Sequence, residues 1–80
     1  MHFIYLIQSI KYPEQYYFGQ TINLKLRLAK HNEGGSSHTS KYRPWKIITY
    51  LAFEDKEKAI AFEKFIKSGS GREFAKKRLL

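Results

Sequence analysis

The first twenty residues alternate between apolar runs and short polar breaks. Residues 2–8 (HFIYLIQ) form a nearly continuous apolar run rich in β-branched and aromatic side chains. Such a run is typical of a central strand that is covered on both faces. The polar stretch 9–15 contains Pro13 and predicts a hairpin connection. Residues 16–20 (YYFGQ) predict the antiparallel partner strand, in which Gly19 either ends the strand or allows close approach of another backbone.

The middle of the chain predicts a helix, a loop and a third strand. Residues 24–32 (LKLRLAKHN) favour helix by composition, with Asn23 as a candidate N-cap and Gly34 just beyond the end. Residues 34–44 (GGSSHTSKYRP) are rich in Gly, Ser and basic side chains, which predicts an exposed and mobile loop. Residues 45–53 (WKIITYLAF) then predict a strand.

The C-terminal third predicts two helices. Asp55 is a candidate cap for a helix extending to about Ser68, which Gly69 would close. Residues 70–73 (SGRE) have the pattern of a capping box that opens a final helix. The predicted order is therefore β-β-α-β-α-α. We expect an α+β fold with a three-stranded antiparallel sheet flanked by helices, in a single domain over residues 1–80.

Composition narrows the class of protein. The chain has 80 residues, including six Tyr, six Phe and one Trp, whose large side chains help a small core. It contains no cysteine, which excludes a disulfide framework or a thiolate metal site and fits a cytoplasmic location. No apolar run approaches the roughly 18 residues needed to span a bilayer. The N-terminus lacks a basic leader and a small-residue cleavage site, so we expect neither a signal peptide nor a membrane partner.

The charge of the chain favours a polyanionic partner. Lys and Arg number 15 against 7 acidic residues, giving a net charge of +8. Nucleic acid is the first candidate for such a chain. The charge alone does not decide this, because many basic proteins bind nothing specific.

Arg27 and His31 are the first candidate site residues. They are four residues apart on the predicted helix and therefore share a face, beside two leucines. The face is either a solvated basic surface or the border of the buried stripe. Tyr5 and Tyr17 lie on neighbouring predicted strands and could face the same side. Tyrosines in a small core are usually structural, but their hydroxyls need partners when buried.

Glu63 is the most unusual acid of the chain. At 100° per residue, Ala59, Phe62 and Ile66 fall within one apolar arc of the second predicted helix, and Glu63 lies at its edge. A carboxylate beside a core face costs free energy unless a positive group pairs with it. Either Lys67 at i+4 forms an ion pair with it, or the carboxylate binds a hard cation.

An ordered set of motifs over most of the chain matches a known family. The set comprises FIY at 3–5, YFGQT at 17–21, Asn23-Leu24, Arg27, His31, Asn32, RPWK at 43–46 and Glu63. It resembles the GIY-YIG nuclease superfamily, and most closely its small stand-alone bacterial members, which look like the N-terminal nuclease domain of the excision-repair subunit UvrC. The first triplet has Phe in place of Gly and the second has Phe in place of Ile, but both keep the tyrosine.

The resemblance implies a metal-dependent DNA endonuclease that hydrolyses phosphodiester bonds in DNA repair or processing. Glu63 would be the sole protein ligand to Mg²⁺ or Mn²⁺. Tyr5 would act as general base on the attacking water, and Tyr17 would position that water or the phosphate. Arg27 would neutralise charge on the scissile phosphate, while His31 would hydrogen-bond Tyr5 or the phosphate. An unperturbed tyrosine titrates near pH 10, so the base is either Tyr5 or water acidified by the metal.

The same resemblance implies DNA as the partner and no small-molecule cofactor. Lys41, Arg43 and Lys46 would hold the DNA backbone without reading bases. So short a chain leaves little room for a specificity domain, and we expect low sequence specificity or a protein partner that supplies it. Two alternatives remain: a catalytically silent nucleic-acid-binding module on the same fold, and a structural or partner-docking domain.

Overall fold

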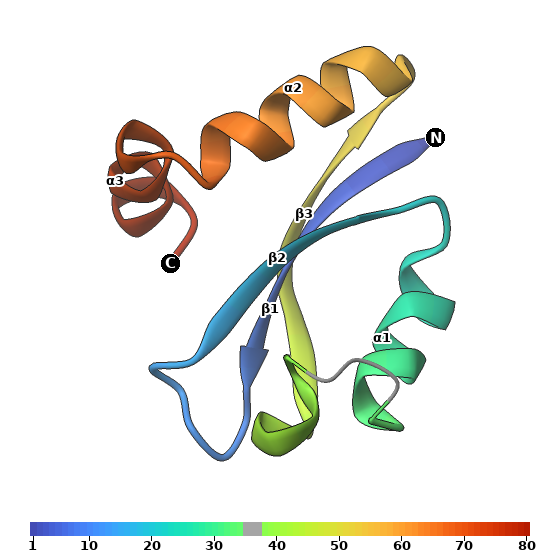
Figure 1. The fold of residues 1–80 in the computed structure, drawn as a ribbon, viewed down its shortest axis with the longest axis vertical. Coiled ribbons are helices and arrows are strands. Elements are labelled where there is room, and N and C mark those ends of the chain that lie inside the picture. The colour runs from blue at the N-terminus through green and yellow to red at the C-terminus, as the bar shows by residue number, and fades with distance from the viewer. Residues whose placement is uncertain (35–37) are drawn as a thin grey trace.

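The computed structural model describes residues 1–34 and 38–80 (Figure 1). Its elements are β1 (His2–Ser9), β2 (Tyr16–Thr21), α1 (Leu24–Asn32), the 3-10 helix η1 (Ser40–Tyr42), β3 (Trp45–Phe53), α2 (Lys56–Ile66) and α3 (Gly69–Arg78). The predicted α+β class and the order β-β-α-β-α-α are confirmed. None of the helices within the described ranges is long and apolar enough to cross a membrane.

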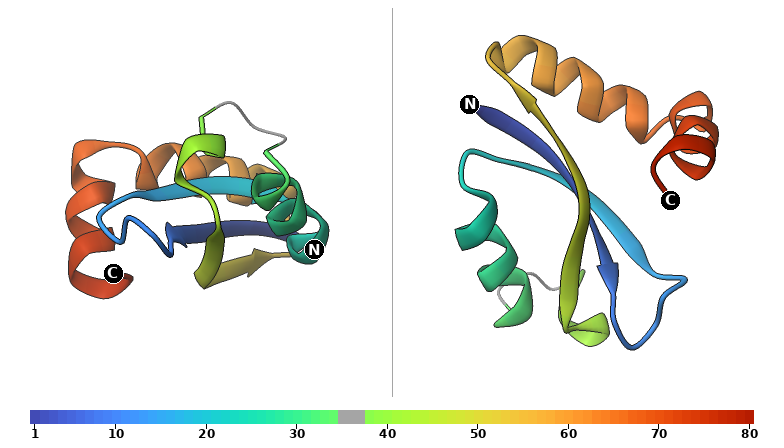
Figure 2. Two further views of the ribbon diagram at one scale, coloured as in Figure 1. Left: turned by 90° about the horizontal axis from the view of Figure 1, so that it is seen from below. Right: turned by 180° about the vertical axis from the view of Figure 1, so that it is seen from behind.

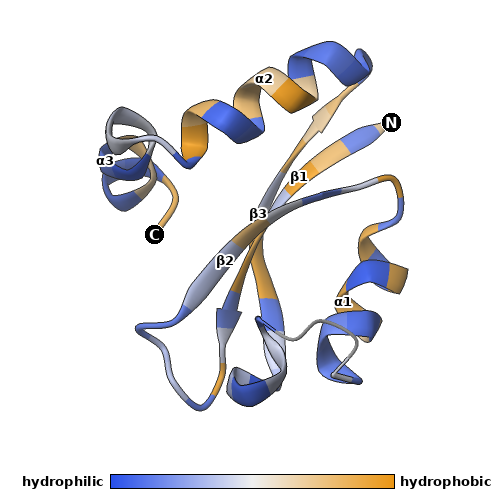
Figure 3. Ribbon diagram, in the orientation of Figure 1, coloured by the Kyte–Doolittle hydropathy of each residue, from blue (hydrophilic) through white to orange (hydrophobic). Residues whose placement is uncertain are grey.

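The sheet has the order β2-β1-β3, and both neighbours run antiparallel to β1. Figure 1 and the two views of Figure 2 show α1 apart from α2 and α3, on the other side of the sheet. The central strand is therefore covered on both faces, as its continuous apolar run predicts. Figure 3 shows the same run as a hydrophobic stretch through the middle of the molecule.

Successive side chains of β1 enter two separate cores, because side chains alternate between the faces of a strand. Leu6 packs with Phe18, Ile66 and Ala75 on the side of α2 and α3. The other core lies on the side of α1 and contains Tyr5, Ile7 and Trp45, with Tyr17, Leu24, Leu28, Tyr42 and Ile47 packed against it. The fold thus directs Tyr5 toward α1.

Two predicted helix starts and one predicted helix end are confirmed. The side chain of Asn23 accepts a hydrogen bond from the Leu26 N–H, and that of Asp55 accepts one from the Glu57 N–H. Both contacts satisfy a backbone donor that has no partner within its own helix. Gly34 follows α1 with φ +83°, a left-handed conformation that glycine adopts without a steric penalty.

The boundary between α2 and α3 differs from the prediction. Helix α2 ends at Ile66, two residues before Ser68, and Gly69 is the first residue of α3 rather than the end of α2. The N-cap of α3 is Ser68, whose hydroxyl accepts from the Gly71 N–H at 3.2 Å, so the capping box at residues 70–73 is wrong. Packing decides the position: a Cβ on Gly71 would overlap the carbonyl oxygen of Phe65.

The described residues among 34–44, predicted to form an exposed loop, are only partly exposed and partly irregular. Residues 35–37 of that prediction lie outside the described residues. Residues 40–42 form η1, and Thr39 is buried. Thr39 is buried because its carbonyl accepts the indole N–H of Trp45 at 2.8 Å, which holds this segment against the sheet.

Candidate active site

Tyr5 lies at the centre of the candidate site, and its neighbours in the sheet fix the position of its ring. It is 2% exposed, and its cross-strand partner on β2 is Gly19. A Cβ on Gly19 would overlap the Tyr5 hydroxyl, so any larger residue there would displace that ring. Gly19 allows the close approach that the sequence predicts, but the group that approaches is the Tyr5 side chain and not a backbone. Strand β2 continues past Gly19 to Thr21, so the glycine does not end the strand.

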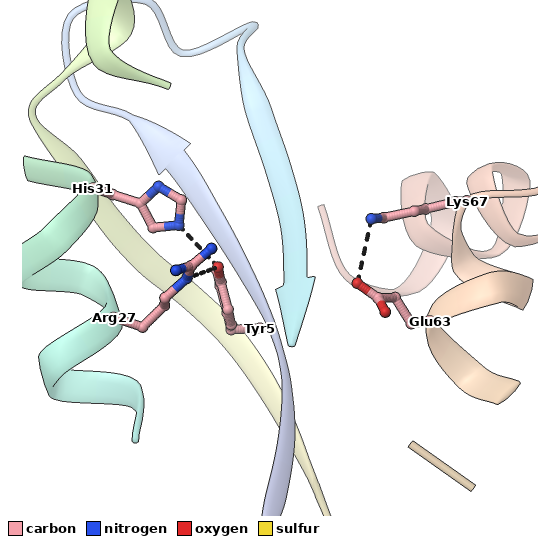
Figure 4. A network of polar contacts seen from close by, with 5 residues as sticks. All are labelled: Tyr5, Arg27, His31, Glu63 and Lys67. Carbon is pink, nitrogen blue, oxygen red and sulfur yellow. Dashed lines mark hydrogen bonds and ion pairs between the residues drawn. The ribbon is translucent and has the colours of Figure 1, made fainter. Parts of the chain in front are cut away.

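Two side chains of α1 hold the Tyr5 hydroxyl (Figure 4). The hydroxyl lies 2.8 Å from Nε2 of His31, and the Nε–H of Arg27 donates to it at 3.1 Å. The spacing of four residues on α1 places both side chains on the face that meets Tyr5. His31 is buried and Arg27 is half-buried, so the alternative of a fully solvated basic face is wrong for this pair.

Thr39 completes the chain of hydrogen bonds behind His31. Its Oγ1 lies 2.7 Å from Nδ1 of His31. Arg27 only donates, so the proton of the Tyr5 hydroxyl needs an acceptor, and His31 Nε2 is the one found within the described residues. We therefore assign the proton of His31 to Nδ1, from which it donates to Thr39 Oγ1. Sequence patterns gave no sign of Thr39, a threonine within a polar stretch.

Burial sets the protonation states of this cluster. Burial raises the pKa of Tyr5, and the hydrogen bond from Arg27 opposes that rise. Burial also lowers the pKa of His31, and the charge of Arg27 lowers it further. The hydrogen bond to Tyr5 raises the pKa of Arg27. Near pH 7 the cluster thus contains a neutral tyrosine, a neutral imidazole and a guanidinium cation.

Tyr17 shares the α1 side of the sheet with Tyr5, as expected for neighbouring strands. Its ring meets the ring of His31 edge to face, with centroids 5.5 Å apart. The Nζ of Lys67 lies 5.7 Å from the centroid of the same ring. Tyr17 therefore connects the Tyr5 cluster to the end of α2.

Glu63 lies where the apolar pattern of α2 predicts, at the edge of a face whose Ala59 and Ile66 are buried. Its Oε2 is 3.3 Å from Nζ of Lys67, so the ion pair left open by the sequence is present (Figure 4). The two side chains are 25% and 48% exposed for Glu63 and Lys67 respectively. The charge of Glu63 also contributes to the raised pKa of Tyr5, which places the carboxylate within electrostatic reach of that hydroxyl.

The chemistry of Glu63 fits a hard divalent cation. The described residues contain no group of three or more His, Cys, Asp or Glu side chains that could hold a metal ion. That arrangement does not suit zinc, which takes three or four protein ligands. It does suit Mg²⁺, which is commonly held by one or two carboxylates together with waters and substrate phosphate. Lys67 is half exposed on a flexible stem and can leave the carboxylate when a cation replaces it.

The three basic residues predicted to hold DNA lie at η1 and at the start of β3. Lys41, Arg43 and Lys46 are all exposed. The Nζ of Lys41 lies over the ring of Tyr42, 5.7 Å from its centroid, and the guanidinium of Arg43 lies against Gly34. Their role in binding stays a prediction.

Comparison with known proteins gives the family. The profile of the family described as the GIY-YIG catalytic domain matches residues 1–78. A UPF0213 protein of Pediococcus acidilactici is 42% identical over 60 residues, covering 71% of this chain and 61% of that protein. The structure-specific endonuclease subunit SLX1 of Debaryomyces hansenii is 37% identical over 67 residues, covering 75% of this chain. The match spans only 19% of the SLX1 subunit.

A solved structure agrees in fold. The solution structure of a UPF0213 protein from Bacillus halodurans superimposes with a TM-score of 0.57 at 26% identity, over 98% of this chain and 85% of that one. The expected resemblance is therefore confirmed, both by the family profile and by the arrangement of the sheet and helices. The chain belongs to the GIY-YIG catalytic domain family.

Proposed function

We propose that this protein is a divalent-metal-dependent endonuclease that hydrolyses phosphodiester bonds in DNA. The observation that carries the proposal is the Tyr5 hydroxyl, buried and held between a neutral imidazole and a guanidinium. A purely structural tyrosine needs one partner, whereas this one contacts two side chains suited to proton transfer and to phosphate charge. Membership of the family and similarity to a relative named as an endonuclease subunit support the same conclusion.

Tyr5 and His31 would together remove the proton from the attacking water. A buried tyrosine with a raised pKa is a poor base alone. With the Tyr5 hydroxyl donating to His31 Nε2, the water proton would pass to the Tyr5 oxygen as the Tyr5 proton passes to His31. The neutral imidazole is the form that can accept it. A divalent ion at Glu63 would polarise the phosphate and acidify water.

Arg27 and Tyr17 would act on the phosphate. Arg27 uses Nε on Tyr5, so its two terminal nitrogens are the atoms that would contact the scissile phosphate. Charge that develops as the bond to the leaving oxygen breaks would be stabilised there. Tyr17, packed on His31, would position the water or the phosphate. Lys41, Arg43 and Lys46 would hold the DNA backbone through phosphate contacts, without selecting a sequence.

The proposal extends to the setting of the reaction. We place the enzyme in the cytoplasm, in DNA repair or processing. Because contacts to phosphate carry no sequence information, a protein partner would supply specificity.

Cleavage assays test the proposal. Plasmid, linear, single-stranded and branched DNA are incubated with Mg²⁺, Mn²⁺ or a chelator. Tyr5→Phe, which removes only the hydroxyl, should lower metal-dependent cleavage by about a hundredfold. The matched control is Tyr50→Phe, because Tyr50 is the cross-strand partner of Tyr5 on β3 and is 54% exposed.

The outcomes separate the nuclease from the catalytically silent binding module. Cleavage at the wild-type rate by the Tyr5→Phe variant would contradict the proposed role of Tyr5. DNA binding without cleavage of any substrate by the wild-type protein would favour the silent binding module.

A further inference from the structure

A pocket of about 460 Å³ lies beside the candidate active site, between β2, the end of α2 and α3. Its volume falls within the range of about 300–1,000 Å³ that is usual for ligand pockets. The floor is apolar and is formed by Phe18 and Ile66, both buried. Cationic and aromatic side chains surround this floor.

The rim is positively charged. Lys67, Arg72 and Lys76 line the pocket, and its lining contains no acidic residue. Arg72 and Lys76 are four residues apart on α3, so they project from one face of that helix. The site therefore favours an anion with an apolar part that can reach the floor.

An aromatic ring stands beside these cations. Tyr16 is 37% exposed and meets Phe18 edge to face, with centroids 6.2 Å apart. An edge-to-face contact covers at most one face of the Tyr16 ring. Cations that follow a phosphate backbone, together with aromatic rings for the bases, are the two features that proteins use to bind single-stranded nucleic acid.

The pocket shares two neighbours with the candidate active site. Tyr17 lines the pocket and also packs on His31, and Lys67 lines the pocket and also pairs with Glu63. A nucleotide in the pocket would therefore lie against Tyr17 and Lys67, which contact His31 and Glu63 of the candidate site. Within a duplex a base is paired and stacked, and removing it from the stack costs free energy.

We infer that this pocket binds one unpaired nucleotide next to the scissile phosphate, so the substrate is DNA with a single-stranded segment at the cleavage site. This inference rests on the proposed function. Tyr16 stacks on the base, and Arg72 and Lys76 contact the adjoining phosphates.

Binding to a short single-stranded oligonucleotide in the presence of a chelator tests the pocket without cleavage. Fluorescence anisotropy over a range of salt concentrations gives the affinity. The double variant Arg72→Ala/Lys76→Ala should lower the slope of log K against log salt by about 1.4, the value for two lost contacts on a single strand. The matched control is Lys77→Ala/Arg78→Ala, which removes one Lys and one Arg from exposed positions of α3 outside the pocket lining.

Tyr16 provides an independent readout. Tyr16→Ala should weaken binding to the oligonucleotide about tenfold, whereas Tyr16→Phe keeps an aromatic face and should bind as the wild type. In the metal-dependent assay, the Arg72/Lys76 variant should lose cleavage of DNA with a single-stranded segment and retain any cleavage of continuous duplex.

Equal losses for the pocket variant and the Lys77/Arg78 control would overturn the inference. Equal losses of activity by the pocket variant on single-stranded and on duplex DNA would also overturn it. Pocket-dependent binding with no cleavage of any DNA by the wild-type protein would instead overturn the proposed nuclease and leave the pocket as a binding site.

Discussion

The two halves of the candidate site are built differently. On the α1 side, Tyr5, His31 and Thr39 are buried and joined by successive hydrogen bonds of 2.7–2.8 Å. On the α2 side, Glu63 and Lys67 are partly exposed and share a single ion pair at 3.3 Å. One half is fixed, and the other can exchange its partner.

The difference fits the chemistry proposed for each half. Proton transfer needs donor and acceptor at hydrogen-bond distance, and a buried network rigidifies its members. A carboxylate that meets a cation must first release its own partner, and an exposed ion pair contributes only about 0–1 kcal/mol. The loose half therefore permits exchange at little cost in stability. Substitutions in each half test whether the two halves differ in this way.

Glu63→Gln should have the largest effect on activity. It keeps the size and helix propensity of the side chain but removes the charge, so metal-dependent cleavage should fall to background. The protection against unfolding that added Mg²⁺ gives should vanish as well, since that protection follows mass action. The melting temperature without metal should change little, because an exposed i,i+4 pair contributes only about 0.2–0.5 kcal/mol. Glu57→Gln, on an exposed turn of α2, is the control. Full cleavage by the Glu63 variant would remove the proposed metal site.

Arg27→Ala should reduce cleavage by about a hundredfold or more. Tyr5 keeps its contact with His31, so the melting temperature should stay close to that of the wild type. Arg27→Lys should rescue poorly, since an ammonium cannot contact Tyr5 and a phosphate in the same planar arrangement. Lys30→Ala removes a charge from an exposed position of α1 and should leave cleavage unchanged. Unfolding of the Arg27→Ala protein would show that Arg27 is structural instead.

Thr39→Val should have a smaller effect on cleavage, and it should act by changing the state of His31. The substitution keeps the shape but leaves His31 Nδ1–H without its acceptor, at a cost of about 1–3 kcal/mol in the free energy of unfolding. Nitrogen NMR of His31 should show a loss of the Nδ1–H tautomer, and cleavage should fall together with it. Thr39→Ser keeps the hydroxyl and should restore both. An unchanged tautomer in the Val variant would contradict the positioning role of Thr39.

The smallest expected effect is on how the stability of the folded protein depends on pH. The pKa of His31 in the folded state lies below its ordinary value of 6.5, so the unfolded chain binds the proton more readily. Its contribution to stability is therefore fully present above pH 6.5 and is lost as the pH falls toward the folded-state pKa. Thermal melts between pH 7.5 and 5 should show this loss, and His31→Asn should reduce it. If the melting temperatures of the wild type and of His31→Asn depended equally on pH, the neutral state assigned to His31 would be contradicted.

Local patterns predicted most of the fold, and tertiary contacts decided the rest. The continuous apolar run of β1 and the caps Asn23 and Asp55 are local features, and the structure has them where expected. Ser68 and Ser70 both suit a helix start, and the structure uses Ser68, whose hydroxyl accepts from Gly71 where that glycine packs against the end of α2.

The candidate site divides in the same way. Helical spacing brought Arg27 and His31 together, and the apolar arc of α2 singled out Glu63. The contact of Thr39 with His31 crosses an irregular segment that has no period, so no pattern in the sequence could predict it. The pairing of Tyr5 with Gly19 depends on the register of the sheet, which the separate strands do not specify.

The indole of Trp45 gives the molecule a built-in optical reporter. Trp45 is the single tryptophan of the chain, and its N–H donates to the carbonyl of Thr39. The side chain of that same threonine holds His31. Tryptophan emission therefore comes from one residue, two hydrogen bonds away from the imidazole, and any ligand that shifts this segment would register as a change in that emission without an attached dye.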